Sequence, residues 1–195
     1  MEQHNIYSTL AHLQGIDQQA ISLLASLFRP ISLEKGQLLC APGQNGRSLY
    51  LLTNGLLHHY RKNQPSTISQ TIRFYLPGSY LGSPAILIPP SDKDYITAIV
   101  QSELLTTTQA EIQQLILTHP KIVQPLFAIN QQISLQQLSL IELLHTQPAD
   151  LRQQLMAQQL GMHRYQIPLQ ILASYLSISR KHLGRLRSKE LRKGK

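Results

Sequence analysis

The chain has 195 residues, of which 42% are hydrophobic and 14% charged, and it contains no Trp, a composition typical of one large or two small globular domains. It has no run of eighteen apolar residues, which excludes a transmembrane helix, and its first residues lack the basic and apolar blocks of a secretory signal. Cys40 is the only cysteine, which excludes an internal disulfide, a thiolate zinc site and a Cys-ligated iron–sulfur cluster within one chain. We expect a cytoplasmic protein without a metal or cofactor.

The net charge of +8 is carried by the C-terminal part of the chain. Residues 1–150 hold eight Lys and Arg and nine Asp and Glu, whereas residues 151–195 hold ten Lys and Arg and a single acid, Glu190. A local basic segment of this kind is typical of nucleic-acid binding. On charge alone, the alternative is a basic tail that only improves solubility.

The first two-thirds of the chain predict one helix followed by many short strands. The helix is expected to begin after Asp17, a favourable N-cap, and to end near Phe28. Residues 31–108 consist of short β-rich runs separated by Gly and Pro turn signals, a texture typical of an antiparallel β-roll or jelly roll. Asn54-Gly55, between two such runs, predicts a two-residue hairpin.

The segment 121–146 is the longest predicted helix. Apolar side chains recur in it at alternating steps of three and four residues, with Gln136 as the one polar exception. This heptad pattern favours a dimerisation helix in which Gln136 or Asn130 fixes the register. The alternative is a core helix that packs on its own chain. The seam consists of Leu126, Ile129, Ile133, Leu140 and Leu143.

The stretch "PLQILASYLSISRKHLGRLRSKEL", residues 168–191, predicts two short helices joined by a tight turn. Pro168 suits the first turn of a helix because it lacks the N–H that would be unpaired there, and apolar residues follow on one helical face. Ser179 is a natural N-cap for a second helix, whose inward stripe is Leu183 and Leu186. This arrangement predicts a helix-turn-helix with its second helix in the DNA major groove.

The second helix, about residues 179–190, carries the predicted DNA contacts. An Arg can donate two hydrogen bonds to guanine O6 and N7, which contributes about 1–3 kcal/mol of discrimination. The Ser179 cap and the first free N–H groups of the helix can hold a phosphate. A solvated amphipathic helix and a membrane-surface helix are the alternatives, and the narrow apolar face argues against the second. The predicted DNA-binding residues are Ser179, Arg180, Lys181, His182, Arg185 and Arg187.

The order helix, β-roll, long helix and C-terminal helix-turn-helix resembles the Crp/Fnr family of bacterial transcription regulators over nearly the whole chain. The stretch "LEKGQLLCAPGQNGRSLYLLTNGLLHHY" is similar to the family's cyclic-nucleotide-binding fold in its turn and strand spacing. "ISRKHLGRLR" resembles the recognition helix, in which a Ser-Arg-Glu-x-x-x-Arg pattern reads DNA. Lys181 stands where that pattern has an acid, which implies a different preferred DNA site because a Lys cannot accept a hydrogen bond from cytosine N4.

The resemblance is greatest to the Bacteroidetes version of the family, on the stretch "IPLQILASYLSISR". Those regulators typically carry Gly where this chain has Ser177, so a positive φ at this position would strain the turn.

The resemblance also implies an effector pocket in the β-roll. cAMP-binding members hold the ribose with a Gly-Glu pair and the cyclic phosphate with an Arg-Ser pair. The corresponding positions here are Gly82-Ser83 and Asp94-Tyr95. Asp94 would repel the phosphate, so we do not expect cAMP to bind in the family's manner. Haem ligation through His4, or through His58 and His59, is not favoured because lone histidines are more often packing or surface residues.

The sequence therefore predicts an α+β fold: an N-terminal antiparallel β-roll or jelly roll with flanking helices, a long dimerisation helix, and a C-terminal winged-helix-like helix-turn-helix domain. The expected domains are residues 1–118, 119–147 and 148–195. The predicted function is a homodimeric transcription regulator that binds a pseudo-palindromic operator in double-stranded DNA and responds to an unknown small-molecule effector. The alternative is a ligand-sensing β-roll protein that acts through protein partners without sequence-specific DNA binding. No enzyme is expected, because the nucleophile elbow, Walker loop, zinc-protease and dinucleotide motifs are absent.

Overall fold

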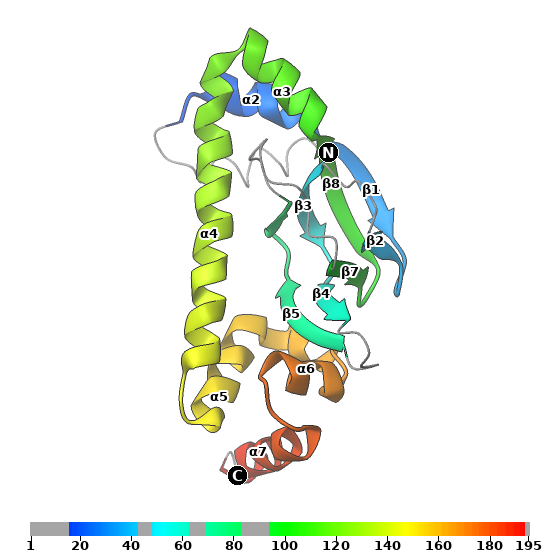
Figure 1. Ribbon diagram of the computed structural model, residues 1–195, viewed down its shortest axis with the longest axis vertical. Coiled ribbons are helices and arrows are strands. Elements are labelled where there is room, and N and C mark those ends of the chain that lie inside the picture. Colours follow the sequence, from blue (N-terminus) through cyan, green and yellow to red (C-terminus); the bar gives the residue numbers. More distant parts are fainter. Residues whose placement is uncertain (1–15, 43–47, 63–68, 83–93, 194–195) are drawn as a thin grey trace.

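The computed structural model of the protein describes residues 16–42, 48–62, 69–82 and 94–193. Two antiparallel sheets form a β-roll, with two short helices at one end and the last helices of the chain at the other (Figure 1). One long helix runs alongside the roll and connects the two ends (Figure 1). The predicted antiparallel β-roll with flanking helices is confirmed.

Each sheet has four strands, and neighbouring strands are antiparallel throughout. The first sheet has the order β1-β8-β3-β6, with bounds Arg29–Leu33, Ser102–Thr108, Ser48–Asn54 and Tyr80–Leu81. The second sheet has the order β2-β7-β4-β5, with bounds Leu38–Cys40, Asp94–Ala98, Leu57–Lys62 and Ser69–Tyr75.

Asn54-Gly55 does not close the hairpin that the sequence predicts. β3 pairs with β6 and β8, whereas β4 pairs with β5 and β7, so the chain crosses here from one sheet to the other. Gly55 has a φ of +102°, and a Cβ at this position would lie 2.6 Å from the Cα of Ser102. The positive φ and this close approach of two backbones, rather than a hairpin turn, require the glycine.

Helix α2 (Gln18–Ser26) begins where the sequence predicts. Asp17 is its N-cap, and one carboxylate oxygen accepts a hydrogen bond from the Gln19 N–H at 2.9 Å. The other carboxylate oxygen lies 3.1 Å from the Lys121 ammonium. The apolar side chains of α2 enter a core cluster that it shares with the first sheet and the long helix.

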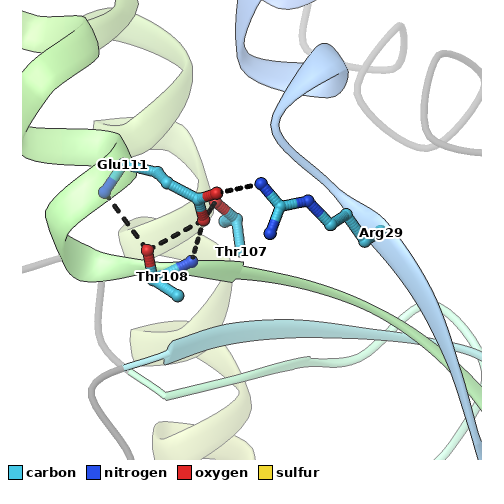
Figure 2. Close-up of polar contacts among 4 residues, drawn as sticks. All are labelled: Arg29, Thr107, Thr108 and Glu111. Carbon is cyan, nitrogen blue, oxygen red and sulfur yellow. Dashed lines mark hydrogen bonds and ion pairs between the residues drawn. The ribbon is translucent and has the colours of Figure 1, made fainter.

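Helix α3 (Gln109–Thr118) follows β8 directly and is fixed to the first sheet through one carboxylate. The Thr108 hydroxyl accepts from the Glu111 N–H at 3.2 Å, and the Glu111 carboxylate accepts from the Thr108 N–H at 2.9 Å, which completes a capping box (Figure 2). Arg29 of β1 forms an ion pair with the same carboxylate (Figure 2). The bonds from Thr108, more than this ion pair, hold the pKa of Glu111 below its usual range.

Helix α4 (Val123–His145) follows a 3-10 turn, η1 (Pro120–Ile122), and matches the predicted segment 121–146 within two residues. It is the long helix that joins the two ends of the molecule in Figure 1. A buried arginine, Arg152, closes its last turn by donating a hydrogen bond to the Leu144 carbonyl at 2.9 Å.

The predicted dimer seam of α4 lies against the protein's own core, which corrects that prediction. Leu126 and Ile129 belong to the cluster that also contains α2, and Leu143 belongs to a cluster with the C-terminal helices. These three side chains are at most 6% exposed, and Ile133 and Leu140 pack against the same clusters. The seam is therefore a core face, because a side chain that is already buried adds little apolar area to a contact with another chain.

The C-terminal unit is entirely helical. It consists of α5 (Ala149–Leu160), a 3-10 turn η2 (Gly161–Tyr165), α6 (Leu169–Tyr175) and α7 (Arg180–Lys193). Residues 109–193, all of them described, contain no strand, so the winged part of the predicted C-terminal domain is not found in this range. The residues between α5 and α6 form η2 and leave no length for a β-hairpin. Among the described residues, no helix is long and apolar enough to cross a membrane.

The C-terminal helices and the β-roll share one hydrophobic cluster. Leu172, Leu176 and Leu183 of α6, its turn and α7 belong to this cluster together with Leu56 of the roll, and Phe74 of β5 packs against it. Burial of apolar area in a common cluster favours one fixed arrangement of the two parts. The position of α7 relative to the roll is therefore part of the fold.

Candidate nucleic-acid interface and effector pocket

The turn between α6 and α7 has the geometry that the sequence predicts. Ser177 has a φ of +53°, the left-handed conformation that favours glycine. Ser179 caps α7, and its hydroxyl accepts a hydrogen bond from the His182 N–H at 3.1 Å. Leu183 and Leu186 are buried, which fixes the face that α7 turns toward the protein.

The opposite face of α7 is basic and exposed. The side chains of Arg180, Lys181, His182 and Arg185 all lie in solvent, whereas Arg187 is half-buried. None of the ion pairs between described side chains involves α7. A cluster of cations without acidic partners attracts polyanions.

Gly184 lies on this helix in open space. Among the described residues, a Cβ at this position would meet no atom within 4 Å, so packing against the described part of the chain does not require a glycine. Since Gly costs about 1 kcal/mol relative to Ala within a helix, a close approach by a partner remains the explanation to test.

Helix α6 is fastened to β5, the last strand of the second sheet. The Ser174 hydroxyl accepts from the Thr71 N–H at 3.0 Å and donates to the Ser69 carbonyl at 3.3 Å. The Thr71 hydroxyl donates to the Ile171 carbonyl at 3.3 Å. The rings of Phe74 and Tyr175 meet edge to face at 5.0 Å. The two bonds of Ser174 satisfy backbone groups on the edge of β5 that has no neighbouring strand.

The described residues predicted for the effector pocket come from both sheets. Gly82 follows β6 in the first sheet, has a φ of +93°, and would overlap the Ser48 carbonyl if it carried a Cβ. Ser83 lies outside the described residues. Asp94 and Tyr95 lie on β7 in the second sheet. Their assignment to one pocket stays a prediction.

Asp94 is neutralised by its neighbours on β4. Arg61 donates a hydrogen bond to it at 2.8 Å, and the Nε2 atom of His59 lies 3.3 Å from its other oxygen. Burial alone would raise the pKa of Asp94, but the bond from Arg61 and the charges of His59 and Arg61 outweigh burial and lower it. The repulsion of a phosphate by Asp94 is therefore weaker than the sequence implies, since its charge is already paired.

The histidines considered for haem are engaged in other contacts, except for His4, which lies outside the described residues. His58 is buried and its Nε2 atom bonds to the Thr71 hydroxyl at 3.0 Å. His59 contacts Asp94 and the Tyr75 hydroxyl. Within the described residues, no group of three His, Cys, Asp or Glu side chains could hold a metal ion.

Sequence analysis missed the apolar surface on the outer side of α4. Five large apolar side chains of this helix are between 49% and 63% exposed. At about 100° per residue, four of them fall within an arc of about 60°, on the side away from the buried seam. A helical projection of all the apolar residues of α4, and not only those of the seam, would have found this surface. We call it the outer face of α4. Its residues are Val123, Phe127, Leu135, Leu138 and Ile141.

Residues 30–119 match the family model described as "Cyclic nucleotide-binding domain". The β-roll has the fold of that domain. Most of the chain is also similar to solved structures that include parts outside this domain. No curated protein sequence is significantly similar to the chain.

Three of these solved structures cover most of the chain. FixK2 from Bradyrhizobium japonicum is 15% identical over 86% of each chain, with a TM-score of 0.69. The regulator CLP from Xanthomonas campestris is 19% identical over 91% of this chain and 93% of its own, also with a TM-score of 0.69. The catabolite activator protein of Thermus thermophilus is 20% identical over 95% of this chain and 88% of its own, with a TM-score of 0.52. At these identities the similarity establishes the fold.

Proposed function

We propose that this protein is a homodimeric DNA-binding transcription regulator of Crp/Fnr type, with α7 in the major groove. The observation that carries the proposal is the exposed basic face of α7, whose cations have no acidic partner among the described side chains and whose position on the cyclic nucleotide-binding domain is fixed by a shared core. The similar structures include a global regulator and a catabolite activator protein, which supports the same function.

The basic face suggests how the base edges are read. Arg180 and Arg185 can each donate two hydrogen bonds to guanine, and Lys181 can reach the same acceptors as a point charge. The Ser179 cap and the first N–H groups of α7 can hold a flanking phosphate. Lys181 has no acceptor for the amino group of cytosine, so the preferred operator should differ from that of regulators with an acid here.

The outer face of α4 supports dimerisation. Its five exposed apolar side chains form a stripe along the helix, and a second copy with its α4 parallel to the first would cover them. Two copies related by a two-fold axis would present two α7 helices to successive major grooves, which requires a separation of about 34 Å. This face replaces the seam that the heptad pattern predicts.

An effector in the roll is part of the proposal, without the cAMP contacts of the family. CLP is described as responsive to c-di-GMP, so cyclic dinucleotides belong in the test beside cAMP and cGMP. A thermal-shift comparison of the three would identify which nucleotide stabilises the domain. A clear rise in Tm with cAMP would contradict the pocket assignment at Ser83 and Asp94.

The function is tested by selecting duplexes from a random pool at several salt concentrations. A sequence-specific dimer enriches a two-fold symmetric motif. Arg185→Ala should then relax one position of each half-site and weaken binding to the selected duplex at least tenfold, within the about 1–3 kcal/mol of a bidentate contact. Lys35→Ala, an exposed lysine in the roll, is the matched control and should leave binding unchanged.

Equal binding to all duplexes with a steep salt dependence would contradict specific readout, because counterion release alone produces that result. The alternative of a sensor that works through protein partners would then take its place.

A further inference from the structure

An aromatic ladder crosses the outward side of the second sheet. Tyr95 stacks on Tyr60 with centroids 5.2 Å apart, Tyr60 on His58 at 4.8 Å, and His58 on Phe74 at 5.5 Å. The Lys62 ammonium lies 4.5 Å from the centre of the Tyr95 ring. The ladder holds these side chains in fixed positions, because each ring is confined by the next.

A cavity of about 1020 Å³ lies between this side of the sheet and the α6–α7 turn. One wall comes from the roll and includes Tyr60, Lys62 and Thr71. The other comes from the C-terminal helices and includes Ile171, Ile178 and Arg180. The volume is at the upper end of the range for small-molecule sites.

This cavity is separate from the predicted effector pocket. His59 and Arg61, which contact Asp94, alternate along β4 with His58, Tyr60 and Lys62. Neighbouring side chains of a strand point to opposite faces of the sheet. The cavity therefore lies on the outside of the roll, whereas the Asp94 cluster lies on its other side.

The described lining of the cavity is cationic and partly apolar. Lys62 and Arg180 supply two positive charges from opposite walls, and the described lining contains no Asp or Glu. Ile171 and Ile178 supply an apolar surface beside them. Two cations facing one another repel unless an anion lies between them.

Histidine 58 contributes a fixed polar group rather than charge. The Thr71 hydroxyl donates its one proton to the Ile171 carbonyl, so the ring of His58 must donate from Nε2. Burial, together with the neighbouring His59, lowers the pKa of His58 to about 4. The ring is neutral at pH 7, and the cations of the cavity are the lysine and the arginine.

We propose that this cavity binds a small organic anion, a phosphate or carboxylate carried on an apolar body. The bound anion would pair with the Arg180 side chain and hold it in the cavity, which lowers the affinity of the protein for DNA. The second half of this inference rests on the proposed function, because it requires Arg180 to contact DNA. The anion would contact both walls, so it would also stabilise the contact of α6 and α7 with the roll. DNA and the anion would then oppose each other by linkage, each weakening the other by the same factor.

The binding half is tested by calorimetric titration of the full chain with 1-naphthyl phosphate and, in parallel, 1-naphthoate. Wild type should bind at least one of them at a single saturable site, more tightly than 1-naphthol or inorganic phosphate. Lys62→Gln should weaken this binding at least fivefold without changing the Tm of the free protein. Lys35→Gln, a lysine outside the cavity lining, is the matched control and should bind as wild type does.

Absence of saturable binding by both aryl anions, or equal binding by wild type and Lys62→Gln, would overturn the proposal. Because this titration contains no DNA, its result is independent of the proposed function.

The coupling half is tested on the duplex selected above. A saturating aryl anion should weaken DNA binding by wild type about tenfold, a coupling of ordinary size, and should have at most a small effect on Lys62→Gln. Undiminished DNA binding at saturation would overturn the coupling and leave the site itself established by the titration. If no duplex is selected, the proposed function fails while the titration still decides whether the cavity binds an anion.

Discussion

Helices α4 and α7 both expose a face that their own fold does not use, and the two faces have opposite chemistry. The outer face of α4 carries five large apolar side chains, from Val123 to Ile141. The outer face of α7 carries Arg180, Lys181, His182 and Arg185. An exposed apolar stripe is typical of a protein–protein contact, whereas a cationic stripe is typical of a polyanion contact.

The buried inner faces of the two helices do not distinguish them. Leu126 and Ile129 of α4 are buried in the same way as Leu183 of α7, and each helix is fixed by a core cluster. Partner choice is therefore a property of the outer side chains, and it can be changed there without unfolding the chain.

Placing charge on the outer face of α4 should abolish its contact with a second copy. The double variant Leu138→Glu and Ile141→Glu should weaken self-association at least about 100-fold, because desolvating a carboxylate at the centre of an apolar contact costs several kcal/mol. Sedimentation equilibrium should give a monomer where wild type gives a dimer. Gln113→Glu, an exposed glutamine of α3, adds a charge elsewhere and should leave the dimer intact. A double variant that remains dimeric would show that the outer face of α4 does not form the dimer contact.

A second prediction concerns the attachment that orients α7. His58 has a pKa of about 4 in the folded protein and about 6.5 when unfolded, so the unfolded chain binds the extra proton between these values. The contribution of His58 to the free energy of unfolding is present above pH 6.5 and is lost as the pH falls toward 4. The free energy of unfolding should therefore fall by about 2 kcal/mol between pH 7 and pH 5 through this residue. Urea unfolding at the two pH values measures it.

The matching variant is His58→Gln, which keeps a hydrogen-bond donor for Thr71 but does not titrate. Between pH 7 and pH 5 this variant should lose less free energy of unfolding than wild type, because most of the loss that we attribute to His58 should be absent. His59, whose pKa is also lowered by burial, remains in both proteins and cancels in the comparison. Identical pH dependence in the two proteins would show that His58 does not titrate as a buried ring.

A third prediction sharpens the basic face. Lys181→Glu supplies an acceptor for the amino group of cytosine, so the selected half-site should gain a C·G preference at one position. Affinity for the wild-type duplex should fall about tenfold, since one contact is lost and a carboxylate is added beside the phosphates. Parallel selections with Lys181→Gln separate the loss of charge from the gain of the acceptor. An unchanged motif in the Glu variant would place position 181 outside the base contacts.

The turn before α7 carries a backbone strain that a single substitution should relieve. Ser177→Gly should stabilise the protein by about 0.5–1 kcal/mol, because glycine adopts a φ of +53° without the steric cost of a side chain. Ser188→Gly, on the exposed side of α7, should destabilise by about 0.5 kcal/mol through helix propensity. Thermal unfolding of the two variants measures both signs. A destabilised Ser177→Gly would mean that the serine side chain has a contact that outweighs the strain.

The elements that sequence analysis predicted best are those whose signals are local. Asp17 caps α2 and Ser179 caps α7 as expected, because an N-cap depends on a few consecutive residues. The Asn54-Gly55 signal was misleading, because the same dipeptide that forms a hairpin also occurs where the chain crosses between sheets, and the strands that β3 and β4 pair with are distant in the sequence.

The candidate site was predictable only in part, because local sequence signals do not show which distant segments meet. The basic face of α7 follows from helical periodicity, but the cavity joins Lys62 to Arg180, which are far apart in the chain. The heptad pattern of α4 identified an apolar face correctly and assigned it to the wrong neighbour, because periodicity records that a face is covered and not by which chain.

The two hydrogen bonds between Ser174 and β5 also bear on aggregation. Without α6, the Thr71 N–H and the Ser69 carbonyl would lie bare along an unpaired strand. Such a strand is a template for addition of another chain, so the β-roll produced alone should tend to aggregate through β5. Helix α6, in the part of the chain that we assign to DNA recognition, would thus also protect the edge of β5 from pairing with a strand of another chain.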